Sequence, residues 1–463
     1  ARRPPARARL EFESFEPRVL LSADLLPASA APEPSTTPVE QRLVEAQGSN
    51  DDNPITIRWD GASGGVPVAA TGAAPAGVSV QDADGTVAEL QISGPGSASW
   101  QTSNGQLTLR IDDSTSETQV LLHTSGGDGR IGVHAIHAMS ALGRAALGQL
   151  DLSGLAQFDG GVGTLELGQL QGAVVQIGGN GPAQISLVDV HDSQLLAEGA
   201  SVALQVDSWH SSSSGASRID VAQLRSLHSG GDLEADLQVR GIGQTGYLLG
   251  LVQVAGAIDR GHWNVEGRAN RITAQHTGAA WHLNVSGTLA LLQTTADAAG
   301  QVSVAGLQML LVGGAARELT LLVGADLGND AAIGGSGPNA DTFRPGTLAR
   351  ARIGGDMHDS LILVGVDPRN GTWLDGDDTL LGTATRHVQE LLVGGQLTGS
   401  TRIVAPAFPG LVRIGGALVD PGTLNLLATR PVDTVAPELS ARLAHDSGAS
   451  STCLLYTSPS PRD

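Results

Sequence analysis

Oxygen-bearing side chains crowd into one short stretch of the chain, residues 367–378, which reads DPRNGTWLDGDD. Carboxylates on glycine-containing loops are the ligands that Ca²⁺ prefers in proteins. The weak calcium candidates in this stretch are Asp367, Asp375, Asp377 and Asp378. A second polar loop contains Asp326, Asn329, Asp330 and Asp341. The alternative is a pair of solvated acidic loops, because the chain has neither EF-hand spacing nor a tandem calcium-binding nonapeptide.

The residues needed to degrade polysaccharides on a β-helix are incomplete. A hydrolase of that kind would combine paired Asp residues with Gly-His-Gly and Arg-x-Lys. The chain has Asp112-Asp113, Asp377-Asp378 and Gly261-His262, but all 27 of its basic residues are Arg. A P-loop and an HExxH helix are also missing from the sequence. We therefore expect no enzyme activity, no catalytic residues and no cofactor.

Composition narrows the class of protein. The net charge of −20 argues against nucleic acid and anionic membranes as partners, since both require a basic face. The single cysteine, Cys453, excludes a disulfide framework. No uninterrupted apolar run reaches the roughly 18 residues of a membrane-spanning helix. With 62 Gly and only 5 Phe, 6 Trp and 2 Tyr, the chain favours a thin aliphatic core.

One phrase recurs in the second half of the chain: an apolar pair, then Gly-Gly, then a short run rich in Val, Ile and Leu. The expected repeat corners are Gly313, Gly314, Gly354, Gly355, Gly394, Gly395, Gly415 and Gly416. The first glycines, Gly313, Gly354, Gly394 and Gly415, are spaced by 41, 40 and 21 residues, which we interpret as two, two and one turns of one repeat. Gly230-Gly231-Asp232 is interpreted as an earlier copy.

This period predicts an all-β fold, a parallel β-solenoid (β-helix) with coils of about 20 residues, because glycine pairs and β-branched runs suit sharp corners and strands. Residues 55–430 would then form about 15 to 19 coils. Two excursions, residues 325–349 and 365–387, are expected to be loops on a single face, often the binding face of a solenoid. An antiparallel sandwich array is the main alternative, and Asn104-Gly105 and Asn370-Gly371 are its hairpin signals.

Side-chain alternation supports the strands. Leu107, Leu109 and Ile111 are expected to share one face. The six tryptophans could offer flat faces to sugar rings, but the expected role is to cap the ends of the core. Trp263 and Trp281 lie 18 residues apart, close to one coil, and are expected to stack in adjacent turns.

The N-terminal segment carries a second signal. Residues 15–23 read FEPRVLLSA and resemble the LEPR-XLL motif, found near the N-terminus of very large, repetitive bacterial exported and surface proteins. The corresponding residues, with Phe15 standing where the family has Leu, are Phe15, Glu16, Pro17, Arg18, Leu20, Leu21, Ser22 and Ala23. The resemblance implies that residues 1–26 are a sorting segment for an export machinery. A signal peptide and an amphipathic helix are the alternatives.

The remaining segments are linkers and tails. Residues 27–54 are rich in Pro, Ala, Glu, Ser and Thr, which predicts a flexible linker. A disordered tail is expected at residues 431–452. Residues 453–463 read CLLYTSPSPRD, resemble a translated sequencing-adaptor end and are expected to be non-native, with the natural protein continuing past about residue 450.

Together these patterns predict the N-terminal part of a large secreted or cell-surface bacterial protein. Its expected role is a non-catalytic, adhesin-like scaffold for adhesion or extracellular matrix, with an extracellular glycan or protein receptor as partner. Two alternatives stay open. One is a polysaccharide-degrading β-helix enzyme, either lyase or hydrolase, and the other is a passive surface spacer.

Overall fold

The structure is a computed structural model that describes residues 55–58, 68–71, 78–103, 105–213, 215–241, 246–374, 377–382 and 387–419. All of them belong to one unit of the chain, residues 43–463, and only this unit is considered below. The predicted sorting segment, the linker and both C-terminal tail segments lie outside the described residues. Nothing in the structure tests those predictions.

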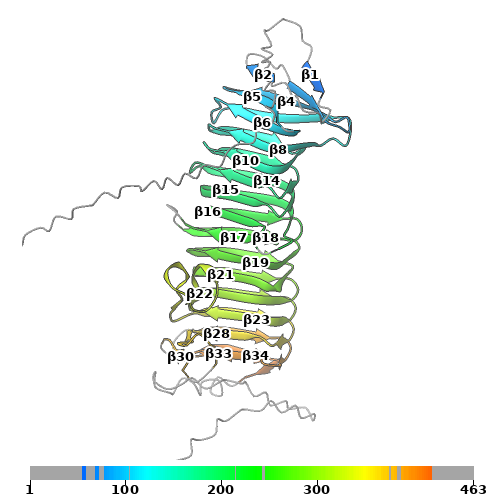
Figure 1. Ribbon diagram of the computed structural model, residues 1–463. Coiled ribbons are helices and arrows are strands. Elements are labelled where there is room, and N and C mark those ends of the chain that lie inside the picture. The colour runs from blue at the N-terminus through cyan, green and yellow to red at the C-terminus, as the bar shows by residue number, and fades with distance from the viewer. Residues whose placement is uncertain are drawn as a thin grey trace, which may run out of the picture. The chain divides into compact units, whose positions relative to one another are not determined.

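Parallel strands stacked coil upon coil make up most of the described chain, which confirms the predicted β-solenoid (Figure 1). The solenoid has about 14 turns of about 20 residues each. Hydrogen bonds link its 31 strands into one continuous sheet. These strands are β1 (Ile55–Arg58), β2 (Val68–Thr71), β3 (Val78–Gln81), β4 (Val87–Ser93), β5 (Ser97–Ser103), β6 (Gln106–Asp112), β7 (Gln119–Ser125), β8 (Ile131–Ala138), β9 (Leu142–Leu147), β10 (Leu150–Phe158), β11 (Val162–Leu167), β12 (Leu170–Gln171), β13 (Val174–Ile177), β14 (Pro182–His191), β15 (Gln194–His210), β16 (Arg218–Ser229), β17 (Asp236–Val239), β18 (Tyr247–Val254), β19 (Ala257–Val265), β20 (Arg268–Ala274), β21 (His276–Thr294), β22 (Ala298–Val312), β23 (Ala316–Val323), β26 (Leu348–Ile353), β27 (Met357–His358), β28 (Leu361–Val364), β31 (Val388–Val393), β32 (Leu397–Thr398), β33 (Arg402–Val404), β34 (Leu411–Ile414) and β35 (Ala417–Leu418).

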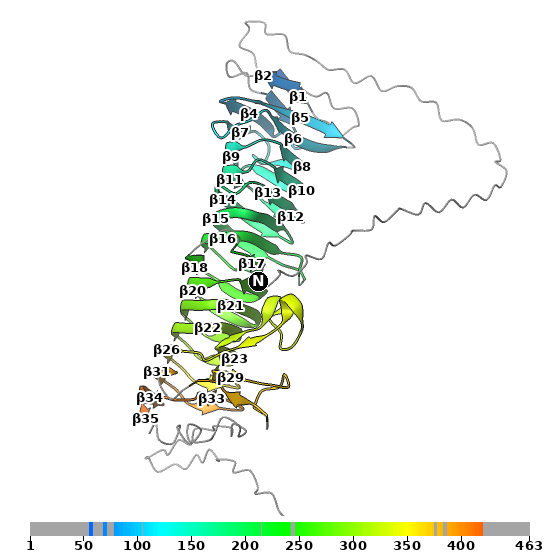
Figure 2. The same cartoon turned by 90° about the vertical axis from the view of Figure 1, so that its left-hand side faces the viewer.

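Each coil has three strand segments, so the solenoid has three faces. We name them in chain order after features described below. The groove face contains β9, β11, β18, β20, β26, β31 and β34, whose labels run down the left-hand edge of Figure 2. The histidine face contains β12, β27 and β32, and the insertion face contains β13, β17, β28 and β33. Long strands such as β15 and β21 bend around corners and contribute to more than one face.

Aliphatic side chains in register fill the interior. Leu107, Leu109 and Ile111 of β6 are all buried, which confirms the predicted alternation. On the groove face one inward row passes through eleven successive strands: Leu165, Ile185, Leu204, Leu227, Val252, Ile272, Leu292, Leu310, Ala351, Leu391 and Val412. Each of these side chains is buried only because a coil lies on either side of it.

The predicted glycine corners lie between the groove face and the histidine face. The N–H of Gly354 donates to the carbonyl of Val312 (2.8 Å), and the N–H of Gly394 donates to that of Ile353 (2.8 Å). Coils whose corner glycines are 41 and 40 residues apart are therefore direct neighbours. The interpretation of these spacings as two turns is wrong, because each is one turn lengthened by an insertion. This also explains why the solenoid has about 14 turns rather than the 15 to 19 expected.

Two other corners extend the pattern. The N–H of Gly230 donates to the carbonyl of Val206 (3.0 Å), so Gly230-Gly231 is an earlier copy as predicted. The last pair, Gly415 and Gly416, has φ angles of 58° and 79°. Glycine adopts this left-handed backbone without a steric penalty, and the chain reverses here, so that β34 and β35 pair antiparallel.

The first described strands pair differently from the rest. β2 pairs with β5, β3 with β4, β4 with β7 and β5 with β6, all antiparallel. A two-residue connection between Ser103 and Gln106 joins β5 to β6, at the predicted Asn-Gly hairpin signal. Continuous parallel stacking begins where β6 pairs with β8, from Thr108 onward. The expected start of the solenoid at residue 55 is therefore too early.

Both insertions leave the solenoid after the insertion face, as predicted for loops on a single face. The first follows β23 and contains β24 (Ala325–Asp326), η1 (Gly328–Asp330), η2 (Gly337–Asn339) and β25 (Thr342–Phe343). The second follows β28 and contains β29 (Val366–Asp367) and β30 (Thr379–Leu380). Phe343 and Trp373 join them in an edge-to-face contact with ring centroids 5.8 Å apart. No helix in the described ranges has the length and hydrophobicity needed to span a bilayer.

Candidate functional site

At the inner corners the first glycine has no room for a side chain. A Cβ atom added to Gly354 would overlap the carbonyl oxygen of Gly313, and one added to Gly394 would overlap that of Gly354. Carboxylates from the preceding coil bind backbone N–H groups at the same corner. The donor–acceptor pairs are Ala257 to Asp232 (2.8 Å), Ala315 to Asp297 (2.8 Å) and Gln396 to Asp356 (2.7 Å). The backbone therefore turns tightly here, with small residues at the surface.

A furrow follows these corners along the solenoid, and we call it the axial groove. It consists of two hollows of about 480 and 560 Å³ that share Thr295. One outward row of the groove face lines both hollows, with each residue paired to the next across neighbouring strands. The row is Gln205, His228, Gln253, Thr273, Gln293, Leu311, Arg352, Leu392 and Arg413. Eight intervals of about 4.8 Å make the row roughly 40 Å long.

The chemistry of the axial groove changes along its length. The first five residues of the row carry amides, an imidazole and a hydroxyl, all of which can form hydrogen bonds. The last four alternate leucine with arginine. Arg352 pairs with Glu390 (2.8 Å), which also pairs with Arg350 (3.0 Å), so one carboxylate is shared between two guanidinium groups. Arg413 is exposed and forms no ion pair with any described residue.

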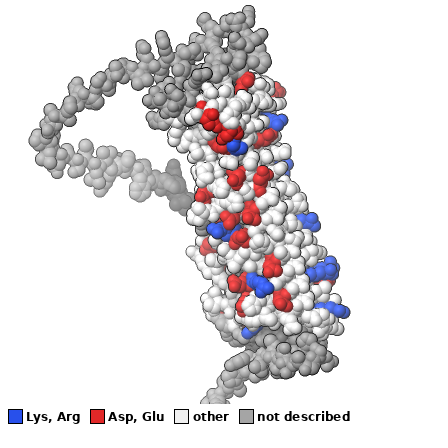
Figure 3. Space-filling view, turned by 90° about the vertical axis from the view of Figure 1, so that its right-hand side faces the viewer, with Lys and Arg blue, Asp and Glu red and all other residues white. Residues whose placement is uncertain are grey.

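This basic end stands out on an acidic protein. In Figure 3 acidic side chains are scattered over the face turned to the viewer, whereas arginines gather along the right-hand edge of its lower half. Arg271 and Arg350 lie on the outward row beside the axial groove, two residues before Thr273 and Arg352. Arg350, Arg352, Arg413 and Glu390 therefore occupy the basic end of the groove face, while Arg271 lies beside its polar half.

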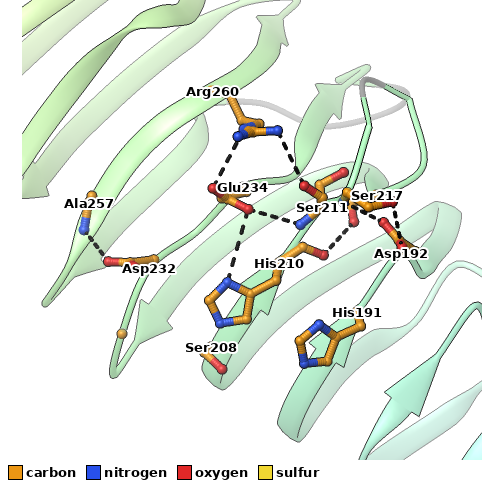
Figure 4. Close-up of polar contacts among 12 residues, drawn as sticks. His191, Asp192, Ser208, His210, Ser211, Ser217, Asp232, Glu234, Ala257 and Arg260 are labelled. Carbon is orange, nitrogen blue, oxygen red and sulfur yellow. Dashed lines mark hydrogen bonds and ion pairs between the residues drawn. The ribbon is translucent and has the colours of Figure 1, made fainter.

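Histidines and carboxylates form a separate polar cluster on the histidine face, drawn in Figure 4. His191 and His210 come from adjacent coils and stack with ring centroids 5.1 Å apart. Glu234 accepts a hydrogen bond from the N–H of Ser211 (3.0 Å) and pairs with Arg260 (3.5 Å). The cluster therefore links successive coils through their side chains.

The cluster does not have the geometry of a nucleophile activated by a base. The hydroxyl of Ser208 donates to Asp189 Oδ1 (2.5 Å), and His191 Nε2 contacts Asp189 Oδ2 (3.0 Å). Both groups bind the carboxylate, so these contacts do not direct the imidazole at the hydroxyl. Burial raises the pKa of Asp189, but the hydrogen bonds from Ser208 and His191 outweigh it and leave the pKa below its ordinary value.

A second charged cluster lies on the insertion face. Asp220 is buried and binds Arg240 through two hydrogen bonds (2.9 and 2.7 Å). Arg218 also donates to it, at 2.5 Å. Burial raises the pKa of nearby Glu266, and the charge of Arg240 opposes this shift. The raised pKa makes Glu266 the carboxyl group in this cluster best suited to donate a proton.

The structure places the calcium candidates in the second insertion. Asp367 Oδ1 accepts a hydrogen bond from the N–H of Arg369 (3.1 Å), and the buried Asp378 accepts one from that of Leu374 (2.5 Å). Asp377 is also described, whereas Asp375 lies outside the described residues. Among the described residues, no three His, Cys, Asp or Glu side chains converge to hold a metal ion. Calcium binding stays a prediction.

The first insertion is fastened to the solenoid by two buried asparagines. Asn284 Nδ2 donates to Asp326 (2.9 Å) and to the carbonyl of Gly328 (2.8 Å), while Asn284 Oδ1 accepts from the N–H of Leu327 (3.0 Å). Asn264, in the adjacent coil, donates to Asn329 (2.8 Å). The polar residues of this loop that resembled metal ligands thus bind protein donors.

Four of the five tryptophans in the described part of the chain lie in the core and offer no face to a sugar. Trp100, Trp209, Trp263 and Trp281 are all at most 2 % exposed. Trp263 and Trp281 come from adjacent coils as predicted and meet edge-to-face, with centroids 5.6 Å apart. The sugar-stacking interpretation is wrong for these four residues, because they fill the core.

Sequence reasoning missed the row that lines the axial groove. Its later members occupy the position two residues before the first corner glycine, as Arg352 does before Gly354 and Arg413 before Gly415. The recurring Gly-Gly phrase contains this fixed offset, so the sequence could have identified the row. The concave surface depends on how the coils stack and could not be identified in the same way. Comparison of the chain with protein-family models, curated protein sequences and solved structures returned no match.

Proposed function

We propose that this chain is a non-catalytic β-solenoid scaffold of an exported bacterial surface protein, used in adhesion or in building extracellular matrix. The observation that carries the proposal is the axial groove, because a furrow lined by nine successive strands presents a long, repetitive surface. Such a surface suits an extended partner better than a small substrate. The LEPR-XLL resemblance of residues 15–23 supports export.

The polar clusters support a structural role over a catalytic one. Stacked histidines, the Glu234–Arg260 pair and the Asn264–Asn284 contact all join one coil to the next. Side chains that bind each other across coils stabilise a scaffold. An acidic surface also keeps an extended β protein soluble.

One observation favours the alternative of a polysaccharide-degrading enzyme. Glu266, with its raised pKa, lies near the Asp220–Arg240 pair and has the property required of a general acid. A hydrolase also needs a second carboxylate free to act as base or nucleophile. Asp220 is bound by two arginines, which makes it poorly suited to that task.

A single set of measurements separates the two functions. The purified chain is incubated with acidic glycans, with and without calcium, and is tested for binding to bacterial cells and extracellular matrix. The scaffold proposal predicts binding without release of oligosaccharides. Steady release that Glu266→Gln abolishes would establish the enzyme instead. If the chain binds neither cells, nor matrix, nor glycans, the result would support the alternative of a passive surface spacer.

A further inference from the structure

The axial groove has features that select a class of ligand. It is open, its lining row extends over nine strands from polar side chains to arginines, and Asp207 supplies the one carboxylate among its described lining residues. We propose that it binds a linear acidic polysaccharide, with sugar hydroxyls along the Gln205–Gln293 part of the row and carboxylates at Arg352 and Arg413. This inference rests on the proposed scaffold function and names its ligand and site.

Charge complementarity argues for an acidic polymer. Arg352 and Arg413 occupy the same row two coils apart, a separation of about 10 Å at about 4.8 Å per coil. Arginine is suited to carboxylates because its planar donors form paired, charge-assisted hydrogen bonds. Arg350 on the adjacent row adds positive charge at the same end, and Glu390 balances only part of it.

The first five residues of the row, Gln205 to Gln293, can form hydrogen bonds with sugar hydroxyls. Gln205, His228 and Gln253 are exposed, and each presents both hydrogen-bond donors and acceptors. Because their spacing follows the coils, the same contact is offered at regular intervals. A polymer with a regular repeat can use several of these contacts at once, so that weak individual contacts add to a useful affinity.

Other extended polymers fit less well. A peptide that binds by strand addition needs an unpaired strand edge, but the groove-face strands that carry Leu311, Arg352 and Leu392 are paired on both sides. Single-stranded nucleic acid binds through stacking on aromatic side chains, and the described lining contains none besides His228.

The test uses the full chain and oligogalacturonates, which are linear oligomers of a uronic acid, with binding measured by calorimetry. The double variant Arg352→Ala/Arg413→Ala should weaken binding at least tenfold. Thr295→Trp, which fills the junction of the two hollows from an exposed position, should also weaken it. Methyl-esterified oligomers should bind more weakly than the acid form, and added salt should weaken binding of the acid form.

The matched control is Arg317→Ala/Arg402→Ala, which removes the same charge from the other two faces. The affinity of this control variant for oligogalacturonates should stay within twofold of that of the unchanged protein. Equal losses in both double variants, or no loss in the groove variants, would overturn the proposal. Adhesion to cells or matrix without any oligogalacturonate binding would refute this ligand assignment alone. Loss of both kinds of binding would refute the scaffold function as well.

Discussion

The paired corner glycines lie where neighbouring coils approach most closely. Gly354 stacks directly between Gly313 and Gly394, and its hypothetical Cβ meets the Gly313 carbonyl. The strand residues on either side can vary among Val, Ile and Leu, but this position requires the absence of a side chain. The recurring Gly-Gly is therefore a packing requirement of the corner.

Gly354→Ala should destabilise the protein by about 1–3 kcal/mol, because an overpacked backbone contact must move apart. Gly181→Ala is the matched control, since a Cβ there meets nothing within 4 Å and its φ is not in the left-handed range. Urea unfolding followed by circular dichroism would compare the midpoints. Equal midpoints for the two variants would contradict the role assigned to the corner.

One stacked histidine, His282, makes stability depend on pH. Burial, together with the charge of His262, lowers the pKa of His282, and the two rings stack at 4.8 Å. The unfolded state therefore binds the proton more readily than the folded state. The contribution of His282 to stability is complete above about pH 6.5 and is lost as the pH falls through the lower folded pKa.

His282→Gln should therefore lose less thermal stability between pH 7.5 and pH 5.5 than the unchanged protein does. The exposed residue His123, in β7, supplies the control variant His123→Gln, which should keep the original pH dependence. Melting temperatures at the two pH values are the measurement. The same pH dependence in all three proteins would show that His282 does not carry the effect.

The first insertion is a separate element whose attachment depends on buried amide side chains. Asn284 makes hydrogen bonds to three residues of the insertion and one to Asn264 in the adjacent coil. Ser303 adds a further bond to the carbonyl of Ala325 (3.0 Å). These contacts hold the insertion against the insertion face.

Asn284→Leu should loosen the first insertion while leaving the coils in place, because it removes the donor and acceptor that buried loop groups require. Chymotrypsin cleavage after Phe343, within this insertion, should become several-fold faster. Gln176→Leu is the control, since Gln176 is exposed on the same row of the insertion face and lies several coils away from the insertion. Unchanged cleavage in Asn284→Leu would contradict the attachment described here.

The solenoid as a whole is held together by contacts between neighbouring coils. About 14 turns at about 4.8 Å make the stack of coils roughly 65 Å long. Because distant coils do not touch, stability is expected to be a sum of nearest-neighbour terms. The antiparallel strands β2–β5 cover the first parallel coil and satisfy its strand edges.

Trp281→Ala should therefore open the chain locally. The cavity should cost about 3–5 kcal/mol, and faster hydrogen exchange should appear in β19 and β22, which pair with β21. Exchange in β11 and β31, several coils away, should change much less. Equal acceleration in all four strands would show that the solenoid unfolds as one cooperative body.

Local patterns were sufficient to predict the class of fold. The alternation of Leu107, Leu109 and Ile111 indicates a strand with one buried face, and the Gly-Gly pairs indicate tight corners. Both signals come from the geometry of a few consecutive residues. The Asn104-Gly105 signal correctly predicted the hairpin between β5 and β6. By itself this signal favours an antiparallel sandwich, but the hairpin belongs to the solenoid protein.

The sequence by itself determined that this chain coils, where it turns and which side chains are aliphatic core. Only the tertiary structure decided that Gly313 and Gly354 are one turn apart, that Trp263 and Trp281 are buried and that Arg352 and Arg413 share a groove. These facts depend on which coil lies beside which. That register comes from backbone pairing between residues 18 to 41 positions apart, with the insertions bypassed. Periodicity within a single strand does not contain this information.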